Sequence, residues 1–427
     1  MSGATESERR LATVDALTYW MSPKIPNDQF LLYAFGEGST DVDRALSEIR
    51  RRAQECAELK LRVLDNRRWR YPVWAFREVG PDQFVVHDPV DPTWSGCLAA
   101  VTALAEDQLD ARVSSWRLHV FPAIEGVPGT RLRGAVAVLQ ICHALGDGVR
   151  ASALAAYMFG RAGTVPAVVV RRHTAAGLAR RAFSAGRAHR GLVRDTATGL
   201  VPAQAVSLPA LRTNARPSGP RHVRAVIRQR RHLPGPTITV GVLTAVSTAL
   251  SGHLRELGDD PALLGAEVPM AASGPRLAHN HFGNVGVGLH ADAEQGLRAR
   301  RIAADLYDRR RRAAHPAMRA ERMAFAAIPS PALRWGVAQF DPDVRSATVT
   351  GNTVVSSVNR GAGDLRFGGA PVLLTAGFPS LSPMMGLTHG VHGIGDTIAV
   401  SVHAAQSAIG DVDAYTQRLE HALRQKV

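Results

Sequence analysis

The positive charge of this chain is concentrated in one segment. The 427 residues carry a formal net charge of +14, yet the segment Arg171–Arg231 holds fourteen arginines and a single acidic residue, Asp195. The rest of the chain is nearly neutral. A chain of this length is about right for two domains of ordinary size, and the basic segment divides it accordingly. We predict an N-terminal half at residues 1–165, a basic, partly helical connector at 166–235, and a C-terminal half at 236–427.

Both halves mix strands and helices, which predicts an α/β (α+β) fold. The apolar runs typical of strands are residues 30–35, 71–76, 117–121, 134–141, 267–270, 285–289, 353–358 and 397–403. The helical stretches are residues 41–59, 149–159, 174–198, 238–257, 294–325 and 411–423. Asp41 is the expected N-cap of the first of these helices, and Asp411 or Asp413 that of the last.

The composition excludes several classes of protein. Hydrophobic residues make up 45% of the chain and charged residues 21%, which excludes a mainly disordered chain, a collagen-like repeat and a coiled coil. No run approaches the ~18–20 apolar residues of a membrane-spanning helix, and the first ten residues lack the apolar core of a signal peptide. Three widely spaced cysteines give no basis for a disulfide framework. We therefore expect a cytoplasmic protein.

The basic connector admits three interpretations. Residues 174–198 place Leu178 and Leu192 on one side of a helix and Arg180 and Arg187 elsewhere. Such a basic amphipathic helix suits an anionic membrane or lipid-droplet surface, at ~1 kcal/mol per well-placed cation, and would make the protein peripheral at the inner membrane face. A solvated linker of biased composition is the plainer interpretation. Nucleic acid is the weakest partner, because no known binding motif or interleaved aromatic residue accompanies the arginines.

The segment Ile141–Gly148, with the sequence ICHALGDG, combines residue types that can carry acid–base chemistry. An apolar strand delivers His143 at its end, and an Asp-Gly turn follows before a helix begins. A partly shielded histidine in this place suits a general base near neutral pH. Asp147 could fix the turn through an arginine or backbone amides, and Gly148 permits a backbone conformation that other residues resist. A turn with an incidental histidine would give the same pattern.

The same segment resembles the HHxxxDG motif of the bacterial wax ester synthase/diacylglycerol acyltransferase (WS/DGAT) family, within the chloramphenicol acetyltransferase-like superfamily. The resemblance extends along almost the whole chain, in the order of several weaker segments. These are residues 13–17 (the opening segment), 109–119 (similar to PLD…PLWxxH), 244–250, 268–270 (VPM), 283–284 (GN), 356–358, 367–372 and 411–419.

The resemblance implies two similar halves joined by a basic crossover segment, with an active-site tunnel between them. It implies that His143 is the general base of an O-acyltransferase, which removes a proton from a lipid-like alcohol, such as diacylglycerol or a fatty alcohol, that attacks acyl-coenzyme A. Asp147 and Gly148 are then structural residues of the site. The substrate tunnel is expected to involve Cys142, Asn284, Ser356 and Ser357. Acyl-coenzyme A enters as a co-substrate, and no bound cofactor is expected.

No metal is expected either. His389, His392 and Asp396 include metal-ligand residue types, but they occupy a glycine-rich stretch that we expect to be a loop, without a fourth partner nearby.

The chain departs from the family pattern near the motif. Cys142 stands in place of the first histidine, Ser114 and Ser115 replace the proline and leucine of PLW, and Thr239-Val240 replaces an Asn-Asp pair. Because neighbours on a strand point to opposite faces, Cys142 is not expected to pair with His143 as a nucleophile. The sequence leaves open whether these changes abolish activity. The alternative function is therefore a non-catalytic lipid-binding or scaffolding protein that keeps the tunnel.

Overall fold

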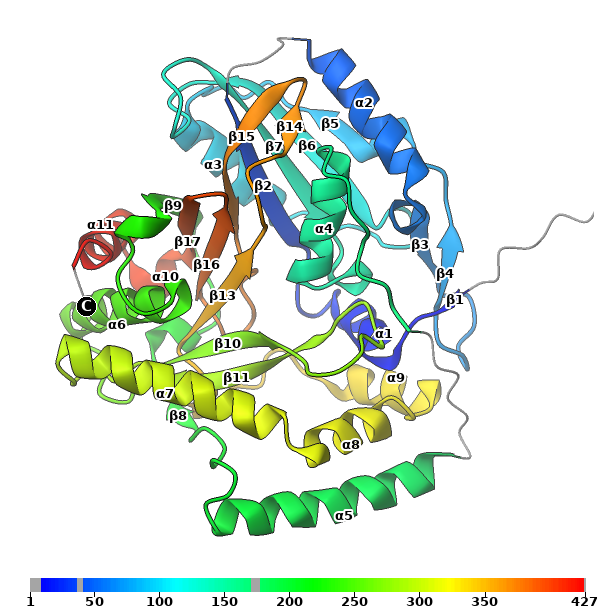
Figure 1. Cartoon of the computed structure of the whole chain (residues 1–427), viewed down its shortest axis with the longest axis vertical. Helices are drawn as coiled ribbons and strands as arrows, with labels where there is room; N and C mark the ends of the chain where they lie inside the picture. Colours follow the sequence, from blue (N-terminus) through cyan, green and yellow to red (C-terminus); the bar gives the residue numbers. More distant parts are fainter. Residues whose placement is uncertain (1–8, 37–40, 170–176, 426–427) are drawn as a thin grey trace, which may run out of the picture.

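Two six-stranded sheets form the framework of the protein (Figure 1). The structure is a computed structural model that describes residues 9–36, 41–169 and 177–425. The strand order is β14-β15-β2-β7-β6-β5 in the first sheet and β11-β10-β13-β16-β17-β9 in the second. Helices cover both sheets, so the predicted α/β class is confirmed.

The strands alternate with helices along the chain, as the sequence pattern predicts. The first sheet contains β2 (Gln29–Phe35), β5 (Phe84–Val86), β6 (Trp116–Ile124), β7 (Gly134–Ile141), β14 (Arg366–Phe367) and β15 (Ala370–Gly377). The second sheet contains β9 (Arg221–Gln229), β10 (Gly265–Ala271), β11 (Phe282–Gly288), β13 (Thr353–Asn359), β16 (Leu387–Ile394) and β17 (Thr397–Ala405). Smaller sheets contain β1 (Arg9–Arg10), β3 (Leu61–Leu64) and β4 (Val73–Phe76), and β8 (Leu208–Pro209) with β12 (Thr348–Val349).

The helices lie mostly where the sequence places them. They are α1 (Thr13–Met21), α2 (Val42–Glu55), α3 (Trp94–Leu104), α4 (Gly148–Met158), α5 (Leu178–Ala197), α6 (Ile238–Glu256), α7 (Gln295–Ala313), α8 (Pro316–Phe325), α9 (Ser330–Gln339), α10 (Gln406–Ile409) and α11 (Val412–Ala422). The Asp41 carboxylate accepts from the Arg44 amide and caps α2, and Asp411 rather than Asp413 caps α11.

One helix prediction is wrong. The stretch 294–325 is not a single helix, because it breaks between α7 and α8. Pro316 has no amide hydrogen to donate, so it cannot continue α7 and instead takes the first position of α8. The His315 side chain accepts from the Ala317 amide and caps the new helix.

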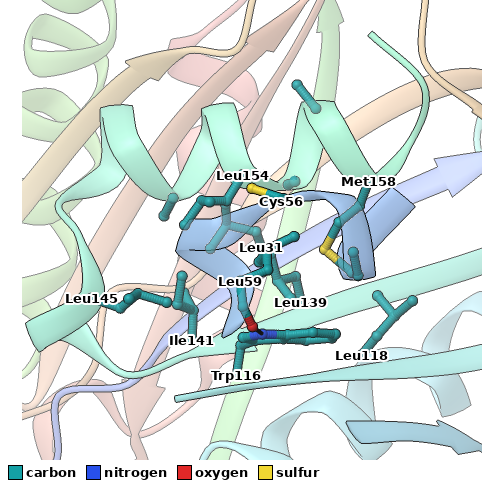
Figure 2. Close-up of a cluster of buried hydrophobic side chains, with 14 of the residues drawn as sticks. Leu31, Cys56, Leu59, Trp116, Leu118, Leu139, Ile141, Leu145, Leu154 and Met158 are labelled. Atoms are coloured by element: carbon teal, nitrogen blue, oxygen red, sulfur yellow. Dashed lines mark hydrogen bonds between the residues drawn. The ribbon is translucent and has the colours of Figure 1, made fainter. Parts of the chain in front are cut away.

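The hydrophobic core of the first half lies between its sheet and α4 (Figure 2). Leu31 and Leu139 from β2 and β7 meet Leu154 from α4. Trp116 lies beneath them, and its indole nitrogen donates to the Leu59 carbonyl at 2.7 Å, so its one polar group is satisfied inside the core. This packing fixes β7 and α4 against each other, and the segment between them contains His143.

The two sheets do not follow the predicted boundaries of the halves. Strand β9, from the predicted connector, is the edge strand of the second sheet, and β15, from the predicted C-terminal half, pairs with β2 in the first sheet. The reason is burial: Val223 of β9 and Ala399 of β17 share one apolar cluster with Phe30 of β2 and Leu374 of β15. The chain therefore crosses between the halves, and the halves share a common core.

Part of the positive charge of the basic connector is neutralised. Beyond α5, several of its arginines pair with acidic residues elsewhere, among them Arg224 with Asp413 and Arg228 with Glu420, at 2.6 and 2.8 Å. Helix α5 lies along the outside of α8 (Figure 1). Residues 170–176, which include Arg171, lie outside the described residues. Within the described part of the chain, no helix is both long and apolar enough to cross a membrane.

The core packing around α4 gives a first testable expectation. Leu154→Ala should lower the free energy of unfolding by about 2–5 kcal/mol, because Leu154 is fully buried and its truncation leaves a cavity. Leu132→Ala removes the same atoms at a loop position that is 60% exposed and should change it by less than about 0.5 kcal/mol. Urea unfolding of the full chain measures both. Equal effects would show that the α4 interface does not pack as described.

Candidate active site

His143 lies at the junction of β7 and α4. Strand β7 is buried along its length, and a short 3₁₀ turn over His143–Leu145 connects it to α4. The Cys142 amide donates to the Ser115 carbonyl at 2.9 Å, so strand-like pairing continues up to the histidine. The turn then brings the chain into α4, whose packing is fixed by the core. The sequence pattern of an apolar strand, a histidine and an Asp-Gly turn thus places His143 on a rigid support.

His143 is shielded from solvent only in part. It stacks on Phe282 with ring centroids 5.6 Å apart, and its Nδ1 atom is buried without a hydrogen-bond partner. The residue as a whole is partly exposed, and because Nδ1 is buried, Nε2 is the ring nitrogen left to act on a substrate. Burial lowers the pKa of His143 from its ordinary value, outweighing opposing contributions from its own backbone, Asn280 and Asp147. The ring is therefore neutral at pH 7, as a general base must be.

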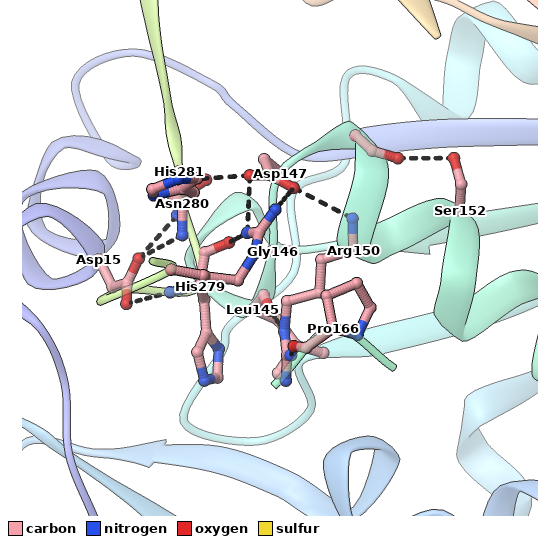
Figure 3. A network of polar contacts seen from close by, with 12 residues as sticks. Asp15, Leu145, Gly146, Asp147, Arg150, Ser152, Pro166, His279, Asn280 and His281 are labelled. Carbon is pink, nitrogen blue, oxygen red and sulfur yellow. Dashed lines mark hydrogen bonds and ion pairs between the residues drawn. The ribbon is translucent and has the colours of Figure 1, made fainter. Parts of the chain in front are cut away.

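The Asp147 carboxylate connects the two halves beside His143 (Figure 3). It caps α4 by accepting from the Arg150 amide at 3.0 Å. It also accepts from the His281 amide at 2.9 Å and from the guanidinium of Arg276 at 2.8 Å. Both partners lie in or next to the loop 272–281, which joins β10 to β11 and reaches across from the second half. The Asp147 carboxylate thus caps α4 and also holds the loop 272–281 in place by hydrogen bonds.

A second carboxylate, Asp15 of α1, fastens the same loop. It accepts from the backbone amides of His279 and Asn280, each at 2.9 Å, and from the Asn280 side chain at 3.0 Å. The Asn280 side chain also donates to the His143 carbonyl at 2.8 Å. Burial raises the pKa of Asp15 to about 6, against the effect of these hydrogen bonds. Asn280 therefore links the backbone of His143 to the loop that covers it.

A charged cluster centred on the buried Arg150 lies beside the site. The Arg150 guanidinium of α4 pairs with the Glu58 carboxylate and donates to the Pro166 carbonyl at 2.6 Å. Glu58, which is partly exposed, also pairs with Arg9 at 3.1 Å. The buried Arg150 thus has an opposite charge in contact, which makes its burial tolerable.

A large cavity lies next to this assembly. Its volume is about 1350 Å³, above the ~300–1,000 Å³ of an ordinary small-molecule pocket. The N-terminal segment 9–15, the β3–β4 hairpin, the loop 272–282 and α8 form its walls. Asn280 and Phe282, both in contact with His143, line the cavity, whereas His143 itself does not. The side chains of Asn280 and Phe282 therefore separate the cavity from His143.

The structure does not bring the four predicted tunnel residues to this cavity. Cys142 packs into the core of the first half. Asn284 is exposed on β11, where its amide donates to Glu267 at 2.5 Å. Ser356 and Ser357 lie on β13, and the Ser357 hydroxyl is 3.2 Å from that of Thr239. The resemblance placed these residues by order along the chain, and that order does not encode which face of a strand they occupy.

The predicted reason for Gly148 is also wrong. Gly148 begins α4 and does not have the positive φ angle that only glycine adopts readily. What excludes a larger residue is space: a Cβ atom at this position would lie 3.0 Å from the side chain of Val358, on β13 of the other sheet. Gly148 lets the two halves approach closely at the site.

The predicted loop with metal-ligand residue types is a strand. His389 and His392 lie on β16, buried, and the His389 ring bonds to Thr353 at 2.9 Å and to Tyr415 at 2.7 Å. Among the described residues, no three His, Cys, Asp or Glu side chains are grouped as a metal site requires.

Three residues of the site were not predicted from the sequence: Asn280, Arg276 and the role of Asp15. The run His279-Asn280-His281 directly before a strand is the signal that could have revealed the first. Nothing in the sequence indicates that the loop containing Arg276 reaches Asp147.

Comparisons with known proteins agree with this architecture. Residues 279–426 match the family model "WS/DGAT C-terminal domain". The wax ester synthase/diacylglycerol acyltransferase from Marinobacter aquaeolei VT8 has a similar structure, with a TM-score of 0.63 at 18% sequence identity, over 97% of this chain and 98% of that one. A search of curated protein sequences finds no match.

A second group of similar structures consists of condensation domains. A mutant of the starter condensation domain of rhizomide synthetase RzmA, in complex with C8-CoA and Leu-SNAC, has a TM-score of 0.59 at 13% identity, over 98% of this chain and 93% of that one. Another mutant, in complex with C8-CoA, has the same TM-score and identity, over 98% and 94%. The predicted two-lobed, chloramphenicol acetyltransferase-like architecture and the resemblance to the WS/DGAT family are confirmed.

The loop contacts can be tested at Asp15. Asp15→Ala should lower the free energy of unfolding by about 2–5 kcal/mol, because it leaves buried amide hydrogens without an acceptor. Asp15→Asn keeps one acceptor oxygen and should lose less. Urea unfolding at pH 7.5, above the raised pKa of Asp15, compares the two. Equal stability of Asp15→Ala and the wild type would contradict the hydrogen bonding described.

Proposed function

We propose that the protein is an acyl-coenzyme A-dependent O-acyltransferase, because residues 279–426 match the family model of the WS/DGAT C-terminal domain. It transfers a fatty acyl group to a lipid-like alcohol such as diacylglycerol or a fatty alcohol, and His143 is the general base. The observation that carries the proposal is the His143 ring: neutral at pH 7, held on a rigid junction, and separated by one side chain from a large, mainly apolar cavity.

The proposed reaction requires little of the protein beyond positioning and one base. Nε2 of His143 takes the proton from the alcohol as its oxygen attacks the thioester carbonyl. The tetrahedral intermediate then expels the coenzyme A thiolate, which receives that proton from His143 as the C–S bond breaks. A thioester is already activated, so a positioned base, which contributes typically ~10²–10⁴-fold, provides a large part of the catalysis that this reaction needs.

The neighbours of His143 have positioning functions in this proposal. Asp147 accepts hydrogen bonds from the Arg150 amide, the Arg276 guanidinium and the His281 amide, as a structural residue would. Asn280 holds the His143 carbonyl, and Phe282 supports its ring. C8-CoA is bound to two mutants of one condensation domain of similar fold, that of rhizomide synthetase RzmA, which supports a coenzyme A thioester as the acyl donor here.

We further propose that the enzyme acts at a membrane or lipid-droplet surface. Four arginines, Arg180, Arg187, Arg190 and Arg194, share the outward face of α5 and are exposed. Within the described residues, none of their guanidinium groups has a partner. Phe183 lies on the same face and is 67% exposed. Cations around an exposed aromatic ring suit a surface of anionic lipid.

The role of His143 has a direct test. His143→Ala should reduce thiol release from hexadecanoyl-coenzyme A, with diacylglycerol as acceptor, by about 10²–10⁴-fold. In the wild type the acid limb of kcat/KM should lie below about pH 6.5, because a lowered pKa keeps the base unprotonated to lower pH. His421→Ala, at an exposed position of α11, is the matched control and should leave the rate unchanged.

Two results would overturn this assignment in different ways. Equal thiol release by His143→Ala and the wild type would remove His143 from its proposed role. A wild-type protein that copurifies with lipid yet releases no thiol with any acceptor tried would instead support a non-catalytic lipid-binding protein.

The α5 surface is tested with vesicles. Arg187→Ala/Arg190→Ala should weaken binding to vesicles containing phosphatidylglycerol about thirtyfold, at ~1 kcal/mol per cation. Arg300→Ala/Arg301→Ala removes two exposed arginines of α7 and should change binding less than threefold. Flotation with vesicles at 0.1 M salt measures both variants. Similar losses in both would indicate attraction by overall charge rather than by the face of α5.

A further inference from the structure

The large cavity has a cationic mouth and an apolar interior. We infer, on the basis of the proposed function, that this cavity binds the acyl-coenzyme A. The phosphates lie against Arg319 and Arg322 of α8, and the remainder of the thioester extends inward toward Phe282 and Asn280. Two features support this placement: the arginines at the cavity mouth have no carboxylate partner among the described residues, and only one substrate of the proposed reaction carries phosphate.

Some charged groups on the cavity wall already have partners. Arg9 is paired with Glu58, and Asp15 accepts hydrogen bonds from His279 and Asn280. Glu321 of α8 is 3.1 Å from the His189 ring of α5. Arg9, Glu58 and Asp15 therefore present little uncompensated charge to a ligand, whereas Glu321 keeps a carboxylate among the arginines of α8.

Arg319 and Arg322 differ from these residues. Both line the cavity, and both are exposed to solvent. Within the described residues neither guanidinium has a hydrogen-bond or ion-pair partner. They lie three residues apart on one helix, and therefore on the same face, with side chains close enough to act on one ligand. Arg10, also exposed on the cavity wall, lies over the Tyr71 ring, 4.0 Å from its centroid, and has no carboxylate partner among the described residues. The cavity thus has three such arginines where it meets solvent, two of them on α8.

The interior of the cavity is mainly apolar. Leu11 and Val14 of the N-terminal segment, Trp74 of β4, and Met323 and Phe325 of α8 line it. The volume of about 1350 Å³ is large enough for an extended ligand. At the inner end, Phe282 and Asn280 are the two lining residues that contact His143. A ligand with an anionic head group and a long apolar chain matches a cavity that is cationic at its mouth and apolar inside.

The charge distinguishes between the two proposed substrates. A coenzyme A thioester carries phosphate groups, whereas a diacylglycerol or fatty alcohol is uncharged. Guanidinium groups bind phosphate through paired, charge-assisted hydrogen bonds, and a neutral alcohol would gain nothing from them. The cationic mouth therefore marks this cavity as the donor side of the site.

Direct binding of octanoyl-coenzyme A to the full-length protein, measured by titration calorimetry, tests the placement without requiring turnover. Arg319→Ala/Arg322→Ala should weaken binding at least tenfold, and adenosine 3′,5′-bisphosphate should compete for the wild-type site. Arg300→Ala/Arg301→Ala, with the same change of charge outside the cavity, should stay within twofold of the wild type. Met323→Trp, which fills the interior, should weaken hexadecanoyl-coenzyme A binding more than octanoyl-coenzyme A binding.

Each other outcome overturns a defined part of the inference. If the wild type binds the thioester and Arg319→Ala/Arg322→Ala binds it equally well, the placement is wrong while the proposed function stands. If the wild type binds no coenzyme A thioester, both are wrong. If the double variant loses binding to phosphatidylglycerol vesicles but keeps octanoyl-coenzyme A, the two cations serve a lipid headgroup, and the donor placement is again overturned.

Discussion

The Asp147 carboxylate is the contact on which the geometry of the site depends. It caps α4, which the core of the first half holds in place, and it binds the guanidinium of Arg276 and the amide of His281 from the second half. The pair with Arg276 is almost completely buried. Removing one partner of such a pair leaves an uncompensated charge, which costs far more than an exposed pair contributes. The relative position of helix and loop, and with it the environment of His143, is therefore strongly constrained.

Much of the fold was predictable because it depends on local sequence patterns. Apolar runs gave the positions of β2, β7, β13 and β17, and capping residues gave the starts of α2 and α11. The stretch of β16 was expected to be a loop, and the helix break at Pro316 was missed. The other errors arose where long-range packing decides. Nothing local shows that β9 joins the second sheet or that β15 pairs with β2, because both strands are selected by the shared core between the sheets.

The candidate site was predictable to the same extent. His143 and Asp147 belong to one continuous motif, so the sequence revealed them together. Asp15 and Asn280 are 265 positions apart in the chain and meet only because α1 and the loop 272–281 pack against each other. The charge count of the connector overstated its free positive charge for a related reason. Arginines that look unpaired in the connector sequence, such as Arg224, find acidic partners on distant helices. On α5, by contrast, four exposed arginines share one face and have no partner in the described chain.

The replacement of the motif's first histidine by Cys142 can now be interpreted physically. The Cys142 side chain is buried in the apolar core of the first half, and burial raises the pKa of its thiol above the ordinary value, so it is an unreactive packing residue. The position of His143 depends instead on the backbone: strand pairing at Cys142, the Asn280 amide on the His143 carbonyl, and the capped start of α4. None of these contacts involves the side chain at position 142. An apolar residue such as Cys142 can therefore replace the first histidine of the motif without moving His143. The proposed chemistry does not require a histidine side chain at position 142.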